Sequence, residues 1–171
     1  MKSVLILIAP SGYQDVEFDG TRKGLIDAGF QIVLGSIEAG QCTGKFGGTE
    51  QATIAFRDVK VSDYDSIAFI GGPGASELWQ NEDAKRIARD AVAARMKLGA
   101  ICIAPKILAA AGVLKGRKAT VWNEDAEQES FLRDHGADYT GDAVTVDGMI
   151  VTGNGPDAAL EFGKMLAVIE S

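Results

Sequence analysis

The chain has 171 residues, of which 46% are hydrophobic and 24% are charged, and its formal net charge is −7. This length and composition predict one globular domain, residues 1–171, with a sizeable core. The acidic balance argues against nucleic acid and anionic membrane surfaces as partners, and no apolar run approaches the length of a membrane span. Two cysteines and one histidine indicate neither a disulfide framework nor a histidine-based metal site.

The N-terminal third predicts strands, a helix and a glycine-rich segment. The apolar run from Val4 to Ile8 is interpreted as a first strand and not as a signal peptide, because no small-residue cleavage site follows it. We therefore expect a cytoplasmic protein. Acids at positions 15 to 17 begin a helix that Gly29 ends, and residues 31–35 form a second strand. Four glycines between positions 39 and 48 predict a mobile loop or a small hairpin, which residues 53–56 continue.

The rest of the chain continues to alternate between strands and helices. The expected elements are a buried strand at 66–70 that ends in Gly71–Gly74, a helix around 87–94, a strand that ends at Ile101, a helix that ends near Gly112, a strand at 118–122, a helix at 127–133, a hairpin around Asp147-Gly148 and a last helix from Pro156. This alternation predicts a parallel sheet covered on both faces. Sites in such sheets form at the carboxyl ends of the strands.

The turn at Cys102 holds the strongest chemical signal in the chain. It follows an apolar strand, and Pro105 suits the first position of a helix. Pro105 also predicts a non-helical backbone at Ala104. A thiol at a helix N-terminus faces free backbone N–H groups, which favour the thiolate and lower the pKa of the cysteine. The alternative is a buried cysteine that acts as a small apolar side chain.

Two other segments supply groups for chemistry beside the thiol. Glu17 is either an acid that suits the helix dipole or a buried carboxyl near Cys102, whose raised pKa keeps it protonated as a hydrogen-bond donor. The backbone N–H groups of Gly71 and Gly72 suit an oxyanion, although a tight turn alone explains both glycines.

Two polar segments have structural alternatives. His135 precedes Gly136 at a predicted helix end, where a cation suits the helix dipole, and this interpretation is favoured over catalysis. Trp122 and Asn123 follow a predicted strand and border the pocket in one interpretation. In the other, Asn123 caps the next helix.

Taken together, these segments resemble the ThiJ/PfpI superfamily over nearly the whole chain. The matching segments are Asp15-Val16-Glu17, Gly71-Gly72, Ala100-Ile101-Cys102 with Pro105, Gly112 to Lys118, Val146-Asp147-Gly148 and Gly155-Pro156. The resemblance implies a flavodoxin-like three-layer α/β sandwich with a mostly parallel, doubly wound sheet. It also implies a homodimer, or a hexamer as in the peptidase-like members.

The same resemblance implies a set of site residues. Cys102 and a protonated Glu17 would be the catalytic pair, and the thiol would sit in a strained backbone. The N–H groups of Gly72 and Ile103 would form an oxyanion hole. The implied pocket has no cofactor and no metal, and its lining is Gly71, Pro73, Trp122, Asn123 and Asn154.

The sequence departs from the family pattern at three places. Ile103 stands where PfpI-type members carry a histidine directly after the cysteine, and isoleucine cannot act as a base. Gly153-Asn154 replaces a Ser-Arg pair near an anion pocket, which removes a charge. Asn123 stands at another position where relatives often have histidine. The first departure weighs against peptidase activity, and the others leave the substrate open.

Three functions are compatible with these residues. The first is a cysteine-dependent enzyme that attacks a small-molecule carbonyl, in glyoxalase- or deglycase-like hydrolysis or hydration of 2-oxoaldehydes or their adducts. The second is a PfpI-type intracellular cysteine peptidase. The third is a non-enzymatic redox sensor or chaperone whose Cys102 is oxidised to the sulfinate.

Overall fold

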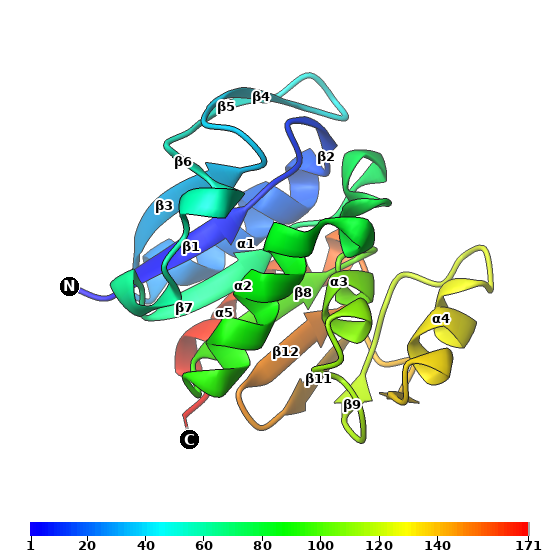
Figure 1. Ribbon diagram of the computed structural model, residues 1–171. Coiled ribbons are helices and arrows are strands. Elements are labelled where there is room, and N and C mark those ends of the chain that lie inside the picture. The colour runs from blue at the N-terminus through cyan, green and yellow to red at the C-terminus, as the bar shows by residue number, and fades with distance from the viewer. Residues whose placement is uncertain (171) are drawn as a thin grey trace.

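The computed structural model describes residues 1–170, which form an α/β sandwich around a seven-stranded sheet (Figure 1). The strands follow the order β11-β12-β8-β7-β1-β3-β6, and every neighbouring pair is parallel except the antiparallel hairpin β11–β12. Their bounds are β1 Ser3–Leu7, β3 Gln31–Ser36, β6 Ile54–Ala55, β7 Ser66–Phe69, β8 Lys97–Ile101, β11 Val144–Asp147 and β12 Ile150–Gly153.

Helices cover both faces of this sheet (Figure 1). The α-helices are α1 Asp15–Asp27, α2 Glu82–Ala93, α3 Pro105–Ala110, α4 Gln128–Asp134 and α5 Ala159–Val168. Helices α1 and α5 lie together on one face, and α2 and α3 lie on the other, with α4 at the side. The prediction of a three-layer sandwich with a mostly parallel, doubly wound sheet is therefore confirmed.

The centre of the sheet is apolar because its strands are buried on both faces. All of Val4–Ile8 and Ile67–Ile70 are buried, with at most 1% of any residue exposed. Strands of this kind lack the alternation of a half-exposed strand and instead show the continuous apolar runs seen in the sequence. Beyond the carboxyl ends of the central strands lie Glu17, in the first turn of α1, and the turns that carry Gly72 and Cys102, and the buried core therefore holds these segments in place.

Glycines allow the backbones of α1 and α5 to come into direct contact. A Cβ atom at Gly24 would lie 2.7 Å from the backbone nitrogen of Lys164, and one at Gly163 would lie 2.5 Å from the carbonyl oxygen of Thr21. A Cβ at Gly20 would meet the side chain of Ala159 at 2.7 Å. The helix that carries Glu17 is thus held tightly against the last helix of the chain.

Small strands and turns complete the fold. The short strands are β2 Ser11–Tyr13, β4 Gly40–Gly44, β5 Thr49–Ala52, β9 Lys118–Ala119 and β10 Asp138–Tyr139. The 3-10 turns are Phe56–Asp58, Val61–Asp63, Pro73–Ala75, Leu78–Gln80 and Pro156–Ala158. The glycine-rich segment is a hairpin in which β4 and β5 pair antiparallel, with Gly40 opposite Ala52.

Four local predictions were wrong. Residues 53–56 do not continue the hairpin, because β6 pairs with β3 in the main sheet and a 3-10 turn begins at Phe56. The strand expected at 118–122 is only β9, which pairs with β10 in a separate sheet. The last helix begins at Ala159, after a 3-10 turn that starts at Pro156. Ala104 is helical, with φ −64° and ψ −27°, because its N–H donates to Ile101 in a tight turn that overrides the influence of the following proline.

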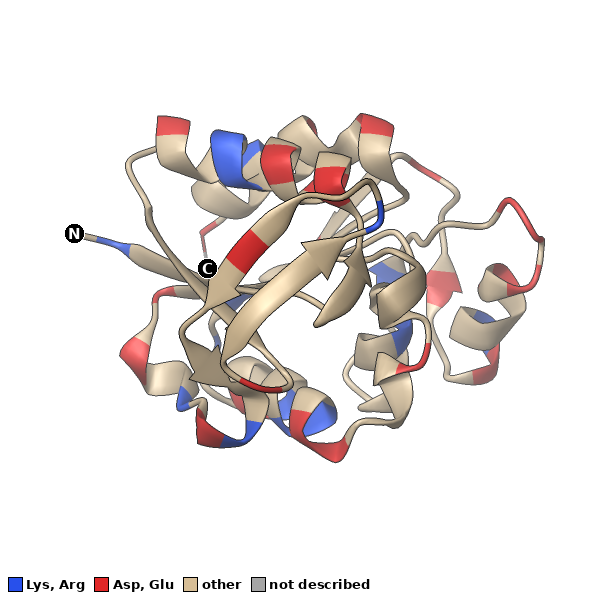
Figure 2. Ribbon diagram, turned by 90° about the horizontal axis from the view of Figure 1, so that it is seen from above, with Lys and Arg blue, Asp and Glu red and all other residues tan. Residues whose placement is uncertain are grey.

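Charged residues lie mainly on the outer helices and connecting segments (Figure 2), and the whole sequence has 24 acidic residues against 17 Lys and Arg. Within residues 1–170, no helix has the length and apolar character needed to cross a membrane. The same part of the chain contains no group of three His, Cys, Asp or Glu side chains arranged to hold a metal ion.

Candidate active site

A cavity of about 720 Å³ opens at the carboxyl ends of the central strands. Segments far apart in the sequence form its walls, and the residues that carry the argument below are Gln14, Glu17, Lys45, Gly72, Pro73, Cys102, Ile103, Trp122, Asn123, Tyr139 and Asn154. This is the edge of the sheet where sites of doubly wound folds form. The cavity therefore lies at the edge of the sheet where the order of strands and helices predicted a site.

The backbone holds Cys102 in a left-handed conformation. Its φ is +63°, which side chains other than glycine rarely adopt. Hydrogen bonds fix this geometry on both sides: the N–H of Cys102 donates to the carbonyl of Gly153 at 2.9 Å, and its own carbonyl accepts from the N–H of Trp122 at 2.8 Å. Strained positions of this kind cluster at functional sites. Cys102 as a whole is only 8% exposed, and it lines the cavity.

Glu17 is completely buried beside this thiol. One carboxyl oxygen, Oε1, accepts a hydrogen bond of 3.1 Å from the N–H of Gly71. The other, Oε2, is buried without a hydrogen-bond partner in the part of the chain that the structure describes. An ionised carboxylate in that position is costly, whereas a proton on Oε2 could be donated to the sulfur of Cys102.

Gly71 and Gly72 bring the backbone close to this pair. A Cβ at Gly71 would lie 2.6 Å from the Cβ of Cys102 and 2.9 Å from Oε1 of Glu17. At Gly72 the φ is +109°, and a Cβ would meet the backbone nitrogen of Gln14 at 2.5 Å. The two glycines are therefore required for the approach to Cys102 as well as for the turn.

Burial raises the pKa of both side chains of the pair. Burial lifts the pKa of Glu17 to about 7, against the opposing effects of the hydrogen bond with the Cys102 side chain and of the Gly71 N–H. Burial also raises the pKa of the Cys102 thiol, and a negatively charged Glu17 raises it further. The backbone N–H groups of Gly72 and Ile103 lower it. The predicted net lowering of the thiol pKa was wrong, because desolvation outweighs the N–H groups at the short helix α3.

The two groups share one proton after the first ionisation. A thiolate beside a neutral Glu17 and a thiol beside an ionised Glu17 carry the same total charge. The first arrangement removes the charge repulsion that raises the pKa of Cys102, and it gives Oε2 of Glu17 a hydrogen to donate. The N–H groups of Gly72 and Ile103 favour the same arrangement, because they hydrogen-bond to the sulfur.

Most of the expected lining residues surround the cavity. Pro73, Trp122, Asn123 and Asn154 line it, but Gly71 does not: it lies behind the pair and donates to Glu17. Asn123 is not the N-cap of α4, which is Glu127, although Oδ1 of Asn123 accepts from the N–H of Glu129 at 3.0 Å in the first turn of that helix.

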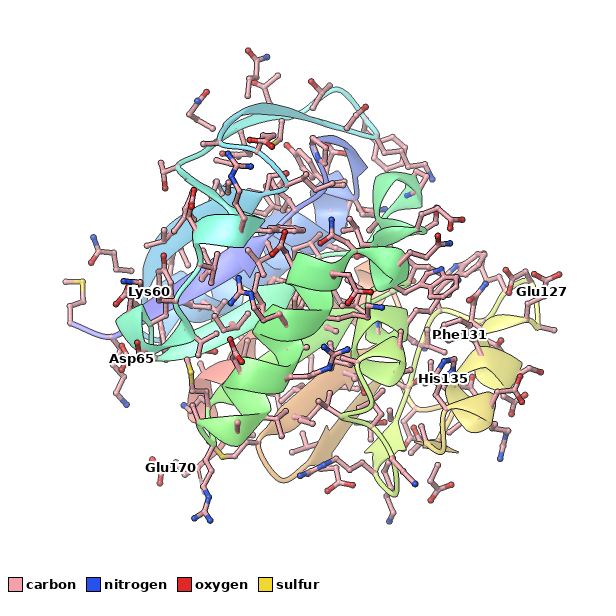
Figure 3. The ribbon with its side chains drawn as sticks, in the orientation of Figure 1. Lys60, Asp65, Glu127, Phe131, His135 and Glu170 are labelled. Carbon is pink, nitrogen blue, oxygen red and sulfur yellow. The ribbon has the colours of Figure 1, made fainter. Side chains whose placement is uncertain are left out.

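His135 lies outside the cavity lining, at the end of α4 (Figure 3). Its ring stacks on Phe131 with the ring centroids 4.4 Å apart, and its Nδ1 lies 2.8 Å from the carbonyl oxygen of Phe131. The structural interpretation of this histidine thus agrees with its position.

Gln14, Lys45 and Tyr139 are among the lining residues that were not expected from the sequence. Lys45 belongs to the β4–β5 hairpin, whose tip is fixed to the start of α1. Asp15 accepts there from the N–H groups of Phe46 at 2.8 Å and Gly48 at 2.9 Å. An acid two residues before Glu17 and a glycine-rich hairpin were both visible in the sequence, but nothing local linked them.

A cysteine in a strained strand-to-helix turn, beside a buried carboxyl and backbone N–H donors, defines an α/β protein with a nucleophile elbow. The chain belongs to the DJ-1/PfpI family, whose model matches residues 2–169.

Individual relatives agree with this assignment. The chain is 34% identical to uncharacterized protein MJ0967 of Methanocaldococcus jannaschii, over 98% of this chain and 82% of that protein. It is 31% identical to a protein of Pyrococcus abyssi named deglycase PYRAB04690, over 95% and 98% of the two chains. It is also 28% identical to the glutathione-independent glyoxalase DJR-1.2 of Caenorhabditis elegans, over 99% and 88%.

A solved structure shows the same fold. The ThiJ/PfpI domain protein from Brachyspira murdochii superposes with a TM-score of 0.92 at 27% identity, covering 96% of this chain and 94% of that one. Relatives named as deglycases and as a glyoxalase indicate enzyme activity in this family.

Proposed function

We propose that this protein is a cysteine-dependent enzyme that converts 2-oxoaldehydes, or their adducts, in a glyoxalase- or deglycase-like reaction. The observation that carries the proposal is the buried pair of Cys102 and Glu17 at the wall of an open cavity. A nucleophile and a proton donor held together against backbone N–H groups suit attack on a carbonyl. The names of the relatives support the same class of substrate.

In the first step, the sulfur of Cys102 attacks the aldehyde carbon of the substrate. A carbon–sulfur bond forms, the C=O π bond opens, and the proton on Glu17 passes to the new alkoxide oxygen. Before that transfer, the N–H groups of Gly72 and Ile103 stabilise the oxyanion. The product is a hemithioacetal beside an ionised Glu17.

In the second step, the ionised Glu17 acts as a base. It removes the hydrogen from the former aldehyde carbon, C1, a double bond forms between C1 and the neighbouring ketone carbon, C2, and the negative charge moves to the oxygen on C2. The proton of the C1 hydroxyl passes to that oxygen, and return of the proton from Glu17 to C2 produces a thioester of a 2-hydroxy acid, which water hydrolyses to release Cys102. The sum is the addition of one water to the 2-oxoaldehyde, and no external oxidant is needed.

Turnover of methylglyoxal by the wild type and by Cys102→Ser tests this proposal. We expect conversion to lactate by the wild type and a loss of at least about a hundredfold in the variant, which lacks the nucleophile. Equal turnover by both proteins would contradict the proposal. Casein cleavage by the wild type, abolished by the same substitution, would favour the peptidase function, for which Ile103 supplies no base.

We also propose that the protein is a homodimer, as its membership of the family suggests. Light scattering at micromolar concentration measures this directly. The chain has a mass of 18.0 kDa, and a species of about twice that mass is expected, because a symmetric dimer is the commonest oligomer of soluble proteins. A particle of 18.0 kDa would contradict the proposal, and a sixfold mass would identify a hexamer.

A further inference from the structure

The side chain of Gln14 is fixed by the start of α1. Its carbonyl oxygen Oε1 accepts hydrogen bonds from the backbone N–H of Val16 at 2.7 Å and of Glu17 at 3.1 Å. Because both partners are donors, the oxygen of the amide must face them, and the NH₂ group must point elsewhere. The cap therefore determines which end of the amide is available for another interaction.

The residue that carries this amide lines the cavity. Gln14 lines the cavity together with Cys102 and is only 7% exposed, and Nε2 has no acceptor among residues 1–170. The backbone N–H of Gln14 donates to the carbonyl of Gly71 at 3.0 Å. Gln14 is thus attached to the same glycine turn that supplies an N–H to the sulfur of Cys102.

We propose that Nε2 of Gln14 binds the second oxygen of the substrate, on the carbon next to the one that Cys102 attacks. This inference rests on the proposed function and specifies its substrate class: carbonyl compounds that carry an oxygen acceptor on the adjacent carbon. A simple aldehyde lacks that oxygen and leaves the amide without a partner. A site built around a polar contact rejects analogues that lack the matching group.

The chemistry of the second step gives this contact a particular value. When Glu17 removes the hydrogen from C1, negative charge moves to the oxygen on C2. A neutral amide N–H stabilises that charge without losing its own proton, until the proton of the C1 hydroxyl passes to this oxygen and Glu17 returns a proton to C2. A carboxylate at position 14 would instead repel the charge. An acid in place of Gln14 should therefore weaken both the binding of the substrate and its turnover.

Gln14→Glu separates the two functions of the side chain. A carboxylate still accepts from the N–H groups of Val16 and Glu17, and it suits a helix N-terminus, so the cap and the thermal stability are retained. It has no N–H to offer the substrate. Gln14→Ala removes both functions, and Gln51→Glu, on the exposed face of the β4–β5 hairpin, makes the same chemical change outside the cavity.

The experiment measures how methylglyoxal and propanal protect Cys102 from alkylation by iodoacetamide, with Cys42 as the internal reference in peptide mass mapping. The ratio of the two protection constants cancels any change in the intrinsic reactivity of the thiol. We expect this ratio to fall about tenfold in Gln14→Glu, which corresponds to one lost hydrogen bond, and to stay at the wild-type value in Gln51→Glu. The kcat for methylglyoxal should fall in Gln14→Glu by at least the same factor.

The outcomes separate this inference from the proposed function. If the wild type turns over methylglyoxal and Gln14→Glu keeps the wild-type ratio, the contact with Nε2 does not exist and only this inference is overturned. If the wild type shows protection and the expected ratio but no turnover, the contact is supported and the proposed reaction is wrong. If the wild type shows neither protection nor turnover, both are wrong.

Discussion

Cys102 has a left-handed backbone conformation, which residues other than glycine rarely adopt. A left-handed residue other than glycine or asparagine costs about 1–3 kcal/mol, and the hydrogen bonds to Gly153 and Trp122 hold it there. The conformation places the sulfur against the N–H groups of Gly72 and Ile103. The backbone strain is thus located at Cys102, the residue that we propose as the nucleophile.

The first prediction concerns the reactivity of Cys102 toward an alkylating agent. Its rate should rise with pH without levelling off near pH 7, because the thiolate is the reactive form and both burial and an ionised Glu17 raise the pKa of the thiol. Cys102 should also react faster than Cys42, which is 1% exposed and lies outside the cavity lining. Peptide mapping after limited iodoacetamide treatment between pH 5 and 9 measures both. Faster labelling of Cys42, or a rate at Cys102 that levels off near pH 7, would contradict this prediction.

The second prediction concerns Glu17→Gln. The amide oxygen can still accept from the N–H of Gly71, and the amide nitrogen can donate to the sulfur, but an amide does not carry a proton to or from the substrate. Alkylation of Cys102 should therefore persist while methylglyoxal turnover falls about a hundredfold to ten-thousandfold.

Glu17→Leu serves as the matched control for this prediction. Leucine leaves the N–H of Gly71 without its acceptor and removes the donor to the sulfur, so it should impair alkylation as well as turnover. If Glu17→Gln turns over methylglyoxal like the wild type, Glu17 is a structural donor only and another base must act.

At the site, the sequence predicted single residues better than their surroundings. The positions of Cys102, Glu17 and Gly72 could be predicted because each follows a recognisable strand. The raised pKa of the thiol could not, because desolvation depends on what covers the sulfur in three dimensions. The position of Lys45 at the cavity could not be predicted either. Hydrogen bonds to the side chain of Asp15 fix the hairpin that carries Lys45, and Asp15 lies far from this hairpin in the sequence.

At the scale of elements, the contact between α1 and α5 depends on absent side chains. Gly24→Ala would normally stabilise a helix by about 1 kcal/mol. Here the added Cβ meets backbone atoms of α5 at 2.7 and 2.9 Å, which cannot move without separating the helices. We predict that the free energy of unfolding falls by about 1–3 kcal/mol, because overpacking outweighs the gain in helix propensity.

Urea unfolding followed by circular dichroism measures this change. Lys23→Ala is the control in the neighbouring position, because Lys23 is exposed and its surface ion pair with Asp27 contributes at most about 0.5 kcal/mol. A Gly24→Ala protein as stable as the Lys23→Ala protein would show that the helices can separate without cost.

The long elements could be predicted because their buried positions are apolar, and these positions recur in the sequence with the period of a helix or a strand. The helix that begins at Asp15 and the hairpin around Asp147-Gly148 formed where expected. The segment at 118–122 misled because its apolar residues pack against the core as an irregular chain, and only Lys118–Ala119 pair with a strand. Apolar residues indicate burial there, but they do not by themselves determine the backbone.

At the scale of the whole molecule, the buried carboxyl links stability to pH. The pKa of Glu17 is about 7 in the folded protein against 4.5 in the unfolded chain, so between these values the folded state binds more protons. Stability from this residue is present in full below pH 4.5 and is lost as pH rises through about 7. The loss is on the order of 3 kcal/mol, at 1.36 kcal/mol per pKa unit.

Glu17→Gln should abolish this contribution, since the amide does not titrate. We predict that, between pH 5 and pH 8, the free energy of unfolding of the wild type falls relative to that of Glu17→Gln. Urea unfolding of both proteins at both pH values measures this change. A wild-type protein whose stability relative to Glu17→Gln is the same at both pH values would show that Glu17 is ionised throughout, or that the unfolded chain shifts its pKa equally.

The glycine contact between α1 and α5 also affects how a library of single variants should be interpreted. Gly24 and Gly163 lie outside the cavity lining, yet side chains at either position would collide with backbone atoms. A selection for enzymatic output alone would score them as severely as Cys102. A parallel score for the amount of folded protein that accumulates would distinguish the two groups: variants of the glycines would be depleted in both scores, and variants of the nucleophile only in the first.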